Sequence, residues 1–581
     1  MKKLYLSIFA LVGMMASAQE LSWQRTIKSN TQDFLSQLTT TIDGQYLLSG
    51  SSIQSQESRT KSQDNQNIPN NNQQSNNGYD YHVVKLNQQG QTVWEKYFGG
   101  NNHDFLTATT STQEGGFLLA GTSFSDVGFQ KKGKQKGGSD IWLIKLDENG
   151  EEQWQKTIGT NVDEEAKSVI QTTDLGYFVA GNAQNKQGGF GSKDVLLVKL
   201  DKTGKLIHQL YIGGKGLDEV EKIIPTKDGG ALVGIYSRSS IMDNGKLKIE
   251  NEASLDEEPI EDIANKTDVN SSISSNTSTT KLNPNPSSLN PNSSTLIPTT
   301  YQPKTTENYG EGDFWVVKLS KDGKVEWQKS FGGKEDDHLR TLVNTETGYI
   351  IAGESRSGNS GNKKSNIKEG TDLWIVSLDE NGEELWQKGY NFNNRDVLMS
   401  LNRIESIKDG NTKGYLLGGY TQAEGKVEKN DETFWMLYLD NKGEEVWRKY
   451  VEGKEKQQEE RLVDAKLNRD GSYLLAGTSA EELGKENWKI VKLADKQIES
   501  LIEKQDLRIY PNPVTDYCYV EIGIEFKEAT INVYDMTGKL AYQTKTKNSV
   551  TKINTANLPQ GTYIVTANTE NKSVTNKIVK K

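Results

Sequence analysis

The sequence is poor in the residues that carry most metal and redox chemistry, with one cysteine, Cys518, and four histidines among 581 residues. A single thiol can form neither an intrachain disulfide nor a paired-thiol centre, so burial and strand pairing must stabilise the fold. A Gly-x-Ser-x-Gly elbow, a phosphate-binding loop and a closely spaced His/Cys pattern are also absent. We therefore assign no catalytic residue, no metal ligand and no cofactor.

Long apolar runs and a basic stripe are missing too. After the N-terminal segment, no stretch approaches the roughly 18 apolar residues that span a bilayer, so we expect a protein that is not integral to a membrane. The net charge is −10, and lysines are scattered through both halves of the chain. Binding of nucleic acid requires positive charge gathered along one surface. We therefore expect no nucleic-acid partner.

The N-terminus has the organisation of a secretory signal peptide. Lys2 and Lys3 precede an apolar run over residues 4–12, and Ala16, Ser17 and Ala18 follow. Charge, apolar core and small residues in this order direct export and are removed by cleavage. We expect residues 1–18 to be cleaved and the mature chain to enter the periplasm.

All eleven tryptophans fall at two positions of one repeat. At the first, tryptophan follows glycine by four residues; His208 replaces it after Gly204, and Trp23 lacks the preceding half. The complete pairs are Gly90/Trp94, Gly150/Trp154, Gly323/Trp327, Gly382/Trp386 and Gly443/Trp447. The second position holds Trp142, Trp315, Trp374, Trp435 and Trp488, with His82 and Leu196 in the other copies.

Each repeat contains four strand candidates and no useful helical periodicity, which is typical of a propeller blade. One unit reads 166–172, 177–181, 194–200 and 205–212 from inner to outer strand. Phe178 to Ala180 are apolar on both faces, as expected between stacked blades, whereas the strand of Trp154 carries charges that protect an exposed edge.

The ends of the repeat region complement each other. Trp23 belongs to an outer strand without its own blade, and residues 461–493 hold inner strands without an outer one. Pairing of the two would remove an open seam. We therefore predict an all-β fold over residues 19–495, a seven-bladed β-propeller of four-stranded blades closed by the N-terminal strand. Six and eight blades are the alternatives.

The longer loops gather on one face of this propeller. Strands alternate in direction, so the connections from second to third strand emerge beside those between blades. They include residues 51–79, 122–139 and 237–312. The last contains a Ser/Thr/Asn/Pro tract too poor in apolar residues to pack, so we expect disorder over about 240–308. If the propeller binds a ligand, this face is the expected place.

A linker over 496–506 precedes a second domain at 507–581, whose short β-like runs suit a small Ig-like β-sandwich. This segment resembles the type A sorting domain of the type IX secretion system of Bacteroidetes. The residues that carry the resemblance are Tyr510, Pro511, Asn512, Pro513, Gly538, Gly561, Tyr563, Lys577, Lys580 and Lys581.

The resemblance implies the type IX machinery as a partner and a secreted or cell-surface protein, released or anchored after loss of this domain. Pro511 and Pro513 also restrict a strand, and Gly538 and Gly561 permit tight turns, whatever their part in sorting. The blade turns resemble the tryptophan-docking repeat of quinoprotein dehydrogenases and of an outer-membrane assembly lipoprotein. That family contains enzymes and scaffolds, so this likeness concerns fold and leaves activity open.

An acidic residue recurs ten positions after the outer-strand aromatic residue, or nine in one unit. These residues are Asp33, Asp104, Asp163, Asp218, Asp337 and Asp396. We expect each to cap the turn into an inner strand, because repeated positions serve repeated geometry. The alternative is a ligand-facing ring at the axial mouth that holds Ca²⁺ or a cationic or hydroxylated ligand.

Export together with variable loops favours a binding or adhesion protein for an extracellular glycan or protein. An enzymatic alternative is a polysaccharide hydrolase or lyase that uses the axial acids. A third is a passive scaffold of the envelope. The sequence ranks a non-enzymatic role first and does not identify the ligand or the oligomeric state.

Overall fold

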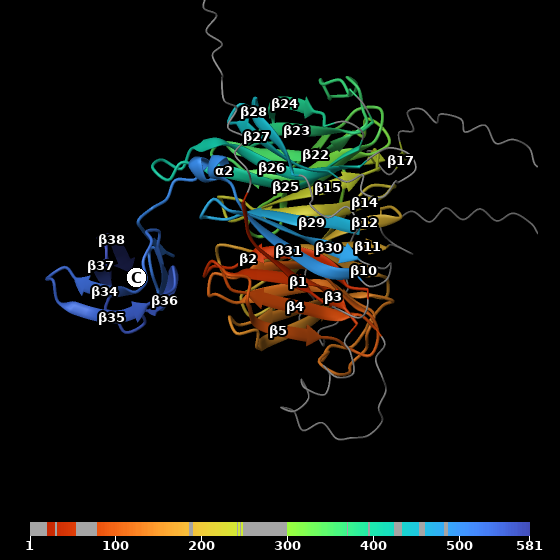
Figure 1. Cartoon of the computed structure of the whole chain (residues 1–581). Helices are drawn as coiled ribbons and strands as arrows, with labels where there is room; N and C mark the ends of the chain where they lie inside the picture. Colours follow the sequence, from red (N-terminus) through yellow and green to blue (C-terminus); the bar gives the residue numbers. More distant parts are fainter. Residues whose placement is uncertain are drawn as a thin grey trace, which may run out of the picture.

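The computed structural model describes residues 20–28, 32–53, 78–184, 190–240, 242–243, 246–247, 299–368, 370–392, 395–422, 433–451, 459–480 and 486–581. The predicted signal peptide and most of the predicted disordered segment lie outside these residues. The described part is almost entirely β-structure, with the short helix α2 (Lys496–Leu501), and the predicted all-β class is confirmed (Figure 1).

Seven sheets of the described chain share one strand order. Blades 1 to 3, from innermost strand outward, are β2 (Phe34–Thr40), β3 (Tyr46–Ser52), β4 (Asp80–Leu86), β5 (Thr92–Phe98); β6 (Asp104–Ser111), β7 (Phe117–Ser123), β8 (Asp140–Leu146), β9 (Glu152–Ile158); and β10 (Glu164–Gln171), β11 (Tyr177–Gln184), β12 (Lys193–Leu200), β13 (Leu206–Gly213). Blade 4 is β14 (Asp218–Pro225), β15 (Ala231–Ser237), β19 (Asp313–Leu319), β20 (Val325–Phe331).

Blades 5 to 7 are β21 (Asp337–Asn344), β22 (Gly348–Ser355), β23 (Asp372–Asp379), β24 (Glu384–Tyr390); β25 (Arg395–Glu405), β26 (Thr412–Gln422), β27 (Thr433–Asp440), β28 (Glu445–Val451); and β29 (Glu459–Leu467), β30 (Tyr473–Ala480), β31 (Glu486–Ala494), β1 (Glu20–Ile27). Each innermost strand contacts that of the next blade, and β29 contacts β2, so the seven sheets form a closed ring. The N-terminal strand β1 pairs antiparallel with β31, as predicted.

Two segments differ from the sequence predictions. Part of the range predicted to be disordered forms β18 (Thr299–Pro303), which pairs parallel with β13 as a fifth strand of blade 3. It uses the backbone groups that an outer strand leaves unpaired. Two short strands, β16 (Met242–Asp243) and β17 (Lys246–Leu247), pair with each other. The predicted linker contains α2, whose N-cap Asp495 accepts hydrogen bonds from the amides of Gln497 and Ile498.

The tryptophans of the third strands lie between neighbouring blades. The side chains of Trp142, Trp315, Trp374, Trp435 and Trp488 are fully buried. His82 takes this position in blade 1 and stacks on Trp488 of blade 7 at 4.4 Å between ring centroids. Burial of such large side chains between neighbouring sheets contributes to the apolar contact that holds the ring together.

The outer-strand tryptophans join each blade to the next. Trp94 of blade 1 packs on Gly150 in the turn between the third and fourth strands of blade 2, and its indole nitrogen donates to the carbonyl oxygen of Glu148 at 3.2 Å. Five further junctions repeat this arrangement, one of them with histidine. They are Trp23 on Gly90, Trp154 on Gly204, His208 on Gly323, Trp327 on Gly382 and Trp386 on Gly443.

These turn glycines have positive φ angles, between +76° and +81°. A side chain there would both strain the backbone and collide with the docked ring. The junction between blades 6 and 7 differs, because the outer strand of blade 7 is the N-terminal strand β1 and no turn connects it to β31. Trp447 of blade 6 instead belongs to a cluster that includes Ile498 and Leu501 of α2.

The C-terminal residues form a separate two-sheet sandwich. One sheet is β32 (Leu507–Tyr510), β33 (Tyr517–Ile522) and β36 (Val550–Asn554); the other is β35 (Leu540–Thr546), β34 (Ala529–Asp535), β37 (Gly561–Thr569) and β38 (Ser573–Lys580). Their inner faces share one apolar core, in which Cys518 is fully buried.

Substitution of one turn glycine tests the docking contact. A Cβ at Gly382 would lie 2.8 Å from the Trp327 ring, whereas one at Gly410, also of positive φ, would meet nothing within 4 Å. Both Gly382→Ala and Gly410→Ala incur the left-handed penalty of about 1 kcal/mol. We expect Gly382→Ala to lower the free energy of unfolding by about 1 to 3 kcal/mol more, because it also overpacks the contact. Urea denaturation measures both, and equal losses would contradict the prediction.

Candidate functional site

The repeated aspartates lie where the innermost strands begin. Asp104, Asp218 and Asp337 open β6, β14 and β21, Asp396 is the second residue of β25, and Asp33 directly precedes β2. All five side chains are buried, none exposing more than 2% of its surface.

Their carboxylates serve the local turns. The carboxylate of Asp104 accepts from the amide of Gly100 at 2.7 Å and from the hydroxyl of Ser125 at 2.9 Å. Asp218 and Asp337 repeat both contacts with glycine and serine in their own blades. These contacts agree with the turn caps that the spacing predicts, and the alternative of a ligand-facing ring at the axial mouth stays a prediction.

The sixth aspartate, Asp163, does not share this environment. It is partly exposed and accepts a hydrogen bond from the amide of Ser139. The equivalent acid is Glu164, which is buried and accepts from the amide and hydroxyl of Thr160. The signal was present in the sequence, since Glu164 lies ten residues after Trp154, the spacing of the other copies.

Three buried lysines, which the sequence reasoning missed, fasten the loops between second and third strands. Lys131 in blade 2 donates to the carbonyl oxygen of Ser125 at 2.6 Å, and Lys363 in blade 5 donates to that of Ser357 at 2.6 Å. Lys304 in blade 4 donates to the hydroxyl of Ser237 and the carbonyl oxygen of Ser239. Lys131 and Lys363 follow these serines by six residues, a spacing visible in the sequence, but Lys304 follows Ser239 by 65.

Burial dominates the electrostatics of these clusters. It lowers the pKa of Lys131, Lys304 and Lys363, an effect that the nearby aspartates oppose. Burial raises the pKa of Asp396 to about 7 and that of Glu164 to about 7. Among the residues that the structure describes, no three His, Cys, Asp or Glu side chains gather as a metal site.

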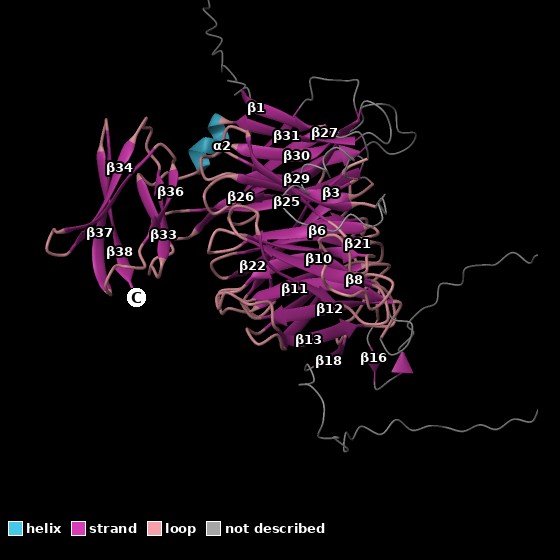
Figure 2. Ribbon diagram, turned by 90° about the horizontal axis from the view of Figure 1, so that it is seen from below, coloured by secondary structure: helices cyan, strands magenta, loops and turns pink. Residues whose placement is uncertain are grey.

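The two faces of the propeller differ. The loop-rich face carries the starts of the innermost strands, the connections between blades and the loops from second to third strand. The short-turn face carries the tight turns, where buried lysines pair with turn acids, as Lys85 does with Asp43 at 3.2 Å. The C-terminal domain lies against the short-turn face, at the left of Figure 2.

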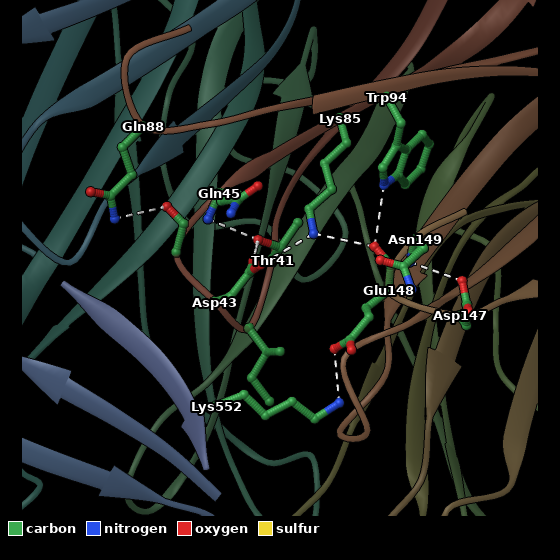
Figure 3. Close-up of polar contacts among 12 residues, drawn as sticks. Thr41, Asp43, Gln45, Lys85, Gln88, Trp94, Asp147, Glu148, Asn149 and Lys552 are labelled. Atoms are coloured by element: carbon green, nitrogen blue, oxygen red, sulfur yellow. Dashed lines mark hydrogen bonds and ion pairs between the residues drawn. The ribbon is translucent and has the colours of Figure 1, made fainter. Parts of the chain in front are cut away.

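Charged and polar pairs hold the two domains together. Lys552 of β36 pairs with Glu148 in a blade 2 turn at 2.8 Å, and Glu148 also accepts, through its carbonyl oxygen, from Lys85 and Trp94 (Figure 3). Gln88 of blade 1 exchanges hydrogen bonds with the Ser549 hydroxyl. The same turn that receives a docked tryptophan thus also receives the C-terminal domain.

Tyr510, one of the predicted sorting residues, lies in this contact. Its hydroxyl accepts from Arg469 of blade 7 at 2.5 Å and donates to the carbonyl oxygen of Ile42 in blade 1 at 3.0 Å. Arg469 also pairs with Glu521 of β33 at 2.8 Å. Tyr519, buried in the same sheet, packs against Gly115 of blade 2.

The other predicted sorting residues lie around the sandwich. Both Pro511 and Pro513 follow cis peptide bonds. The side chain of Asn512 binds the last strand, β38. Its amide nitrogen donates a hydrogen bond to the carbonyl oxygen of Lys577, and its oxygen accepts one from the amide of Val579. The hydroxyl of Tyr563 donates to the carbonyl oxygen of Pro559. Exposed or half-buried positions are held by Gly538, Gly561, Lys577, Lys580 and Lys581.

The geometry defines a β-propeller followed by a docked β-sandwich. Residues 508–581 match the family described as the secretion system C-terminal sorting domain, which confirms the predicted sorting domain and indicates export to the cell surface by the secretion machinery. No curated protein sequence matches the chain. Within the described residues, no helix is long and apolar enough to cross a membrane.

Among the solved structures that are similar to the chain, two show how low the identity is. A Dyadobacter fermentans protein of unknown function has 8% identity and a TM-score of 0.35, over 82% of this chain and 99% of that one. PorZ, a surface component of the type IX secretion system of Porphyromonas gingivalis, has 10% identity and a TM-score of 0.20, over 87% and 80%. The fold assignment rests on the strand pairing described above.

The raised pKa of Asp396 predicts a pH dependence. The native state binds this proton more tightly than the unfolded chain, whose aspartates titrate near 3.9, so unfolding free energy falls as pH rises from about 4 to 7. We expect Asp396→Asn to reduce the loss of stability between pH 5 and pH 8, measured by thermal unfolding. Asp322→Asn, on an exposed turn, is the control. An unchanged pH profile in Asp396→Asn would contradict the assignment.

Proposed function

We propose that the mature protein is a secreted or surface-held binding protein whose loop-rich face takes an extracellular glycan or protein. One observation carries this proposal. The sorting domain covers part of the short-turn face through Lys552, Ser549 and Tyr510, while none of these contacts involves the loop-rich face. Delivery and ligand binding would therefore use opposite faces of one ring.

The construction of the loop-rich face supports a binding role. Loops in three described blades are held by a buried lysine and by an inner-strand aspartate that accepts from a serine two residues beyond the second strand. The described parts of these loops, which are fixed in this way, lose little conformational entropy when a ligand binds.

The enzymatic alternative depended on the axial acids as catalysts. Asp104 and Asp337, two of these acids, are fully buried and engaged in turn contacts. These positions give a polysaccharide no access to the carboxylates, which favours binding over hydrolysis.

We further propose that the sorting machinery reads the exposed parts of the sorting domain, including Lys577 and Lys581.

Removal of residues 507–581 tests delivery. We expect the truncated chain to accumulate in the periplasm, because it lacks the segment that the secretion machinery handles. Cell fractionation and protease treatment of intact cells measure the location. Resistance of the trapped propeller to protease shows that it has folded, and surface delivery equal to that of the full chain would refute the assignment.

A bulky label on either face tests which one binds. Cys518 is fully buried and burial raises its thiol pKa to about 12, so an added surface cysteine can be labelled selectively. We expect polyethylene glycol on Lys134→Cys, on the loop-rich face, to abolish retention on a panel of immobilised extracellular glycans and proteins. The same label on Lys202→Cys, a matched lysine on the short-turn face, should leave retention intact; the reverse pattern would overturn the proposal.

A further inference from the structure

Five aromatic rings meet on the loop-rich face where blades 1 and 2 join. Tyr79 lies 5.1 Å from Phe34 and 5.3 Å from Phe105, measured between ring centroids. His103 stacks on Phe105 at 5.8 Å with an interplanar angle of 15°, and Phe124 meets Phe105 edge-on at 6.3 Å. We name these five residues the aromatic platform.

The platform is open to solvent. Phe34 exposes 41% and Phe124 38% of its surface, and His103 is exposed. Phe129, in the loop that also holds Phe124, is 49% exposed and has a φ angle of +50°. A bulky side chain in the left-handed region is unfavourable, and such residues concentrate at functional positions.

The repeat shows that the fold does not require these rings. The amide of Phe124 donates to the carbonyl oxygen of His103, and Arg238 and Arg356 make the equivalent bond in blades 4 and 5. Phe105 directly follows the inner-strand aspartate of blade 2. The residues at the equivalent position in blades 4 and 5 are Glu219 and His338. The Tyr79 position holds Ser139, Gly312 and Thr371 elsewhere, as shown by the hydrogen bond that each carbonyl accepts from the next inner strand.

The platform is held rigidly in place. The ring nitrogen Nδ1 of His103 accepts from the amide of Tyr79 at 3.2 Å, and the carbonyl oxygen of Tyr79 accepts from the amide of Asp104 at 2.7 Å. The carboxylate of Asp104 in turn accepts a hydrogen bond from the hydroxyl of Ser125 in the loop. The carbonyl oxygen of Ser125 accepts one from the buried Lys131. Rings fixed before binding lose little entropy when a ligand packs on them.

Fixed hydrogen-bond donors lie beside the rings. The side-chain oxygen of Asn101 accepts from the amide of Asp126 at 3.0 Å, and that of Asn102 accepts from the amide of His103 at 2.8 Å. Both side chains are exposed, and within the described residues their amide nitrogens donate to no protein group. An apolar partner would desolvate these donors without supplying acceptors.

We propose that the aromatic platform binds a neutral glycan, with the C–H face of a pyranose ring packed on Phe34, Phe105 or Phe124. The sugar hydroxyls accept from Asn101 and Asn102. This ligand has the required combination of one apolar face and a rim of acceptors. The inference rests on the proposed function and identifies its site and ligand class.

Binding of neutral oligosaccharides to the full mature chain tests the inference. The probes are cellohexaose, laminarihexaose, mannohexaose and xylohexaose, titrated by calorimetry. We expect Phe34→Ser together with Phe124→Ser to weaken binding of the preferred probe at least about tenfold. Tyr301→Ser, at a 60% exposed ring on β18, is the matched control and should leave affinity unchanged. Saturation-transfer NMR should show the sugar C–H protons closest to the protein.

The possible results separate the site from the wider function. Equal affinity in the platform variant and the wild type overturns the platform but not loop-face binding, which the labelled Lys134→Cys variant tests independently. Failure of the wild type to bind any of the four neutral probes overturns the glycan assignment, as does binding of only acidic glycans or only proteins. Because the two substituted rings are exposed, an unchanged thermal unfolding midpoint will show that the variant is folded.

Discussion

Each outer-strand tryptophan that packs on a turn glycine joins one blade to the next, and the other structural features depend on this contact. The ring of Trp94 touches Gly150 and donates to the carbonyl oxygen of Glu148. The contact needs glycine on one side, because only a residue without Cβ lets the ring approach a backbone of positive φ. Repeated at six junctions, it fixes the turns between third and fourth strands on the short-turn face.

That fixed set of turns provides the surface on which the sorting domain lies. The carbonyl oxygen of Glu148 accepts hydrogen bonds from Trp94 and Lys85, and its carboxylate forms an ion pair with Lys552. Tyr510 reaches Ile42 and Arg469, in two neighbouring blades. Blade docking and domain docking are therefore coupled through the same residues, and the opposite face is left for the variable loops.

The loop-rich face combines a constant frame with variable contents. Buried aspartates and lysines recur from blade to blade and keep the loops in position, as Asp104 and Lys131 do in blade 2. The side chains beyond this frame differ between blades. Five aromatic rings gather where blades 1 and 2 meet, and Phe34, Tyr79 and Phe105 come together there from three different strand starts. The frame serves folding, whereas the departures from it indicate function.

The sequence by itself determined the repeat and its phase. Trp154 and its equivalents mark the outer strands, because a local spacing of glycine, turn and aromatic residue encodes a local structure. It also determined ring closure, since Trp23 lacks a blade of its own, and the sorting domain, since its motifs are contiguous. The acids ten residues beyond the tryptophans were visible too, including Glu164 in place of Asp163.

Only the tertiary structure decided which distant residues meet. Lys304 reaches Ser239 across 65 positions, and β18, from the connection between β15 and β19 of blade 4, adds a fifth strand to blade 3. Tyr79 meets Phe34 and Phe105, and Lys552 meets Glu148, through packing that no spacing encodes. The physical reason is that strand and turn patterns follow from neighbours along the chain, whereas these contacts follow from how loops close and surfaces fit after the ring has formed.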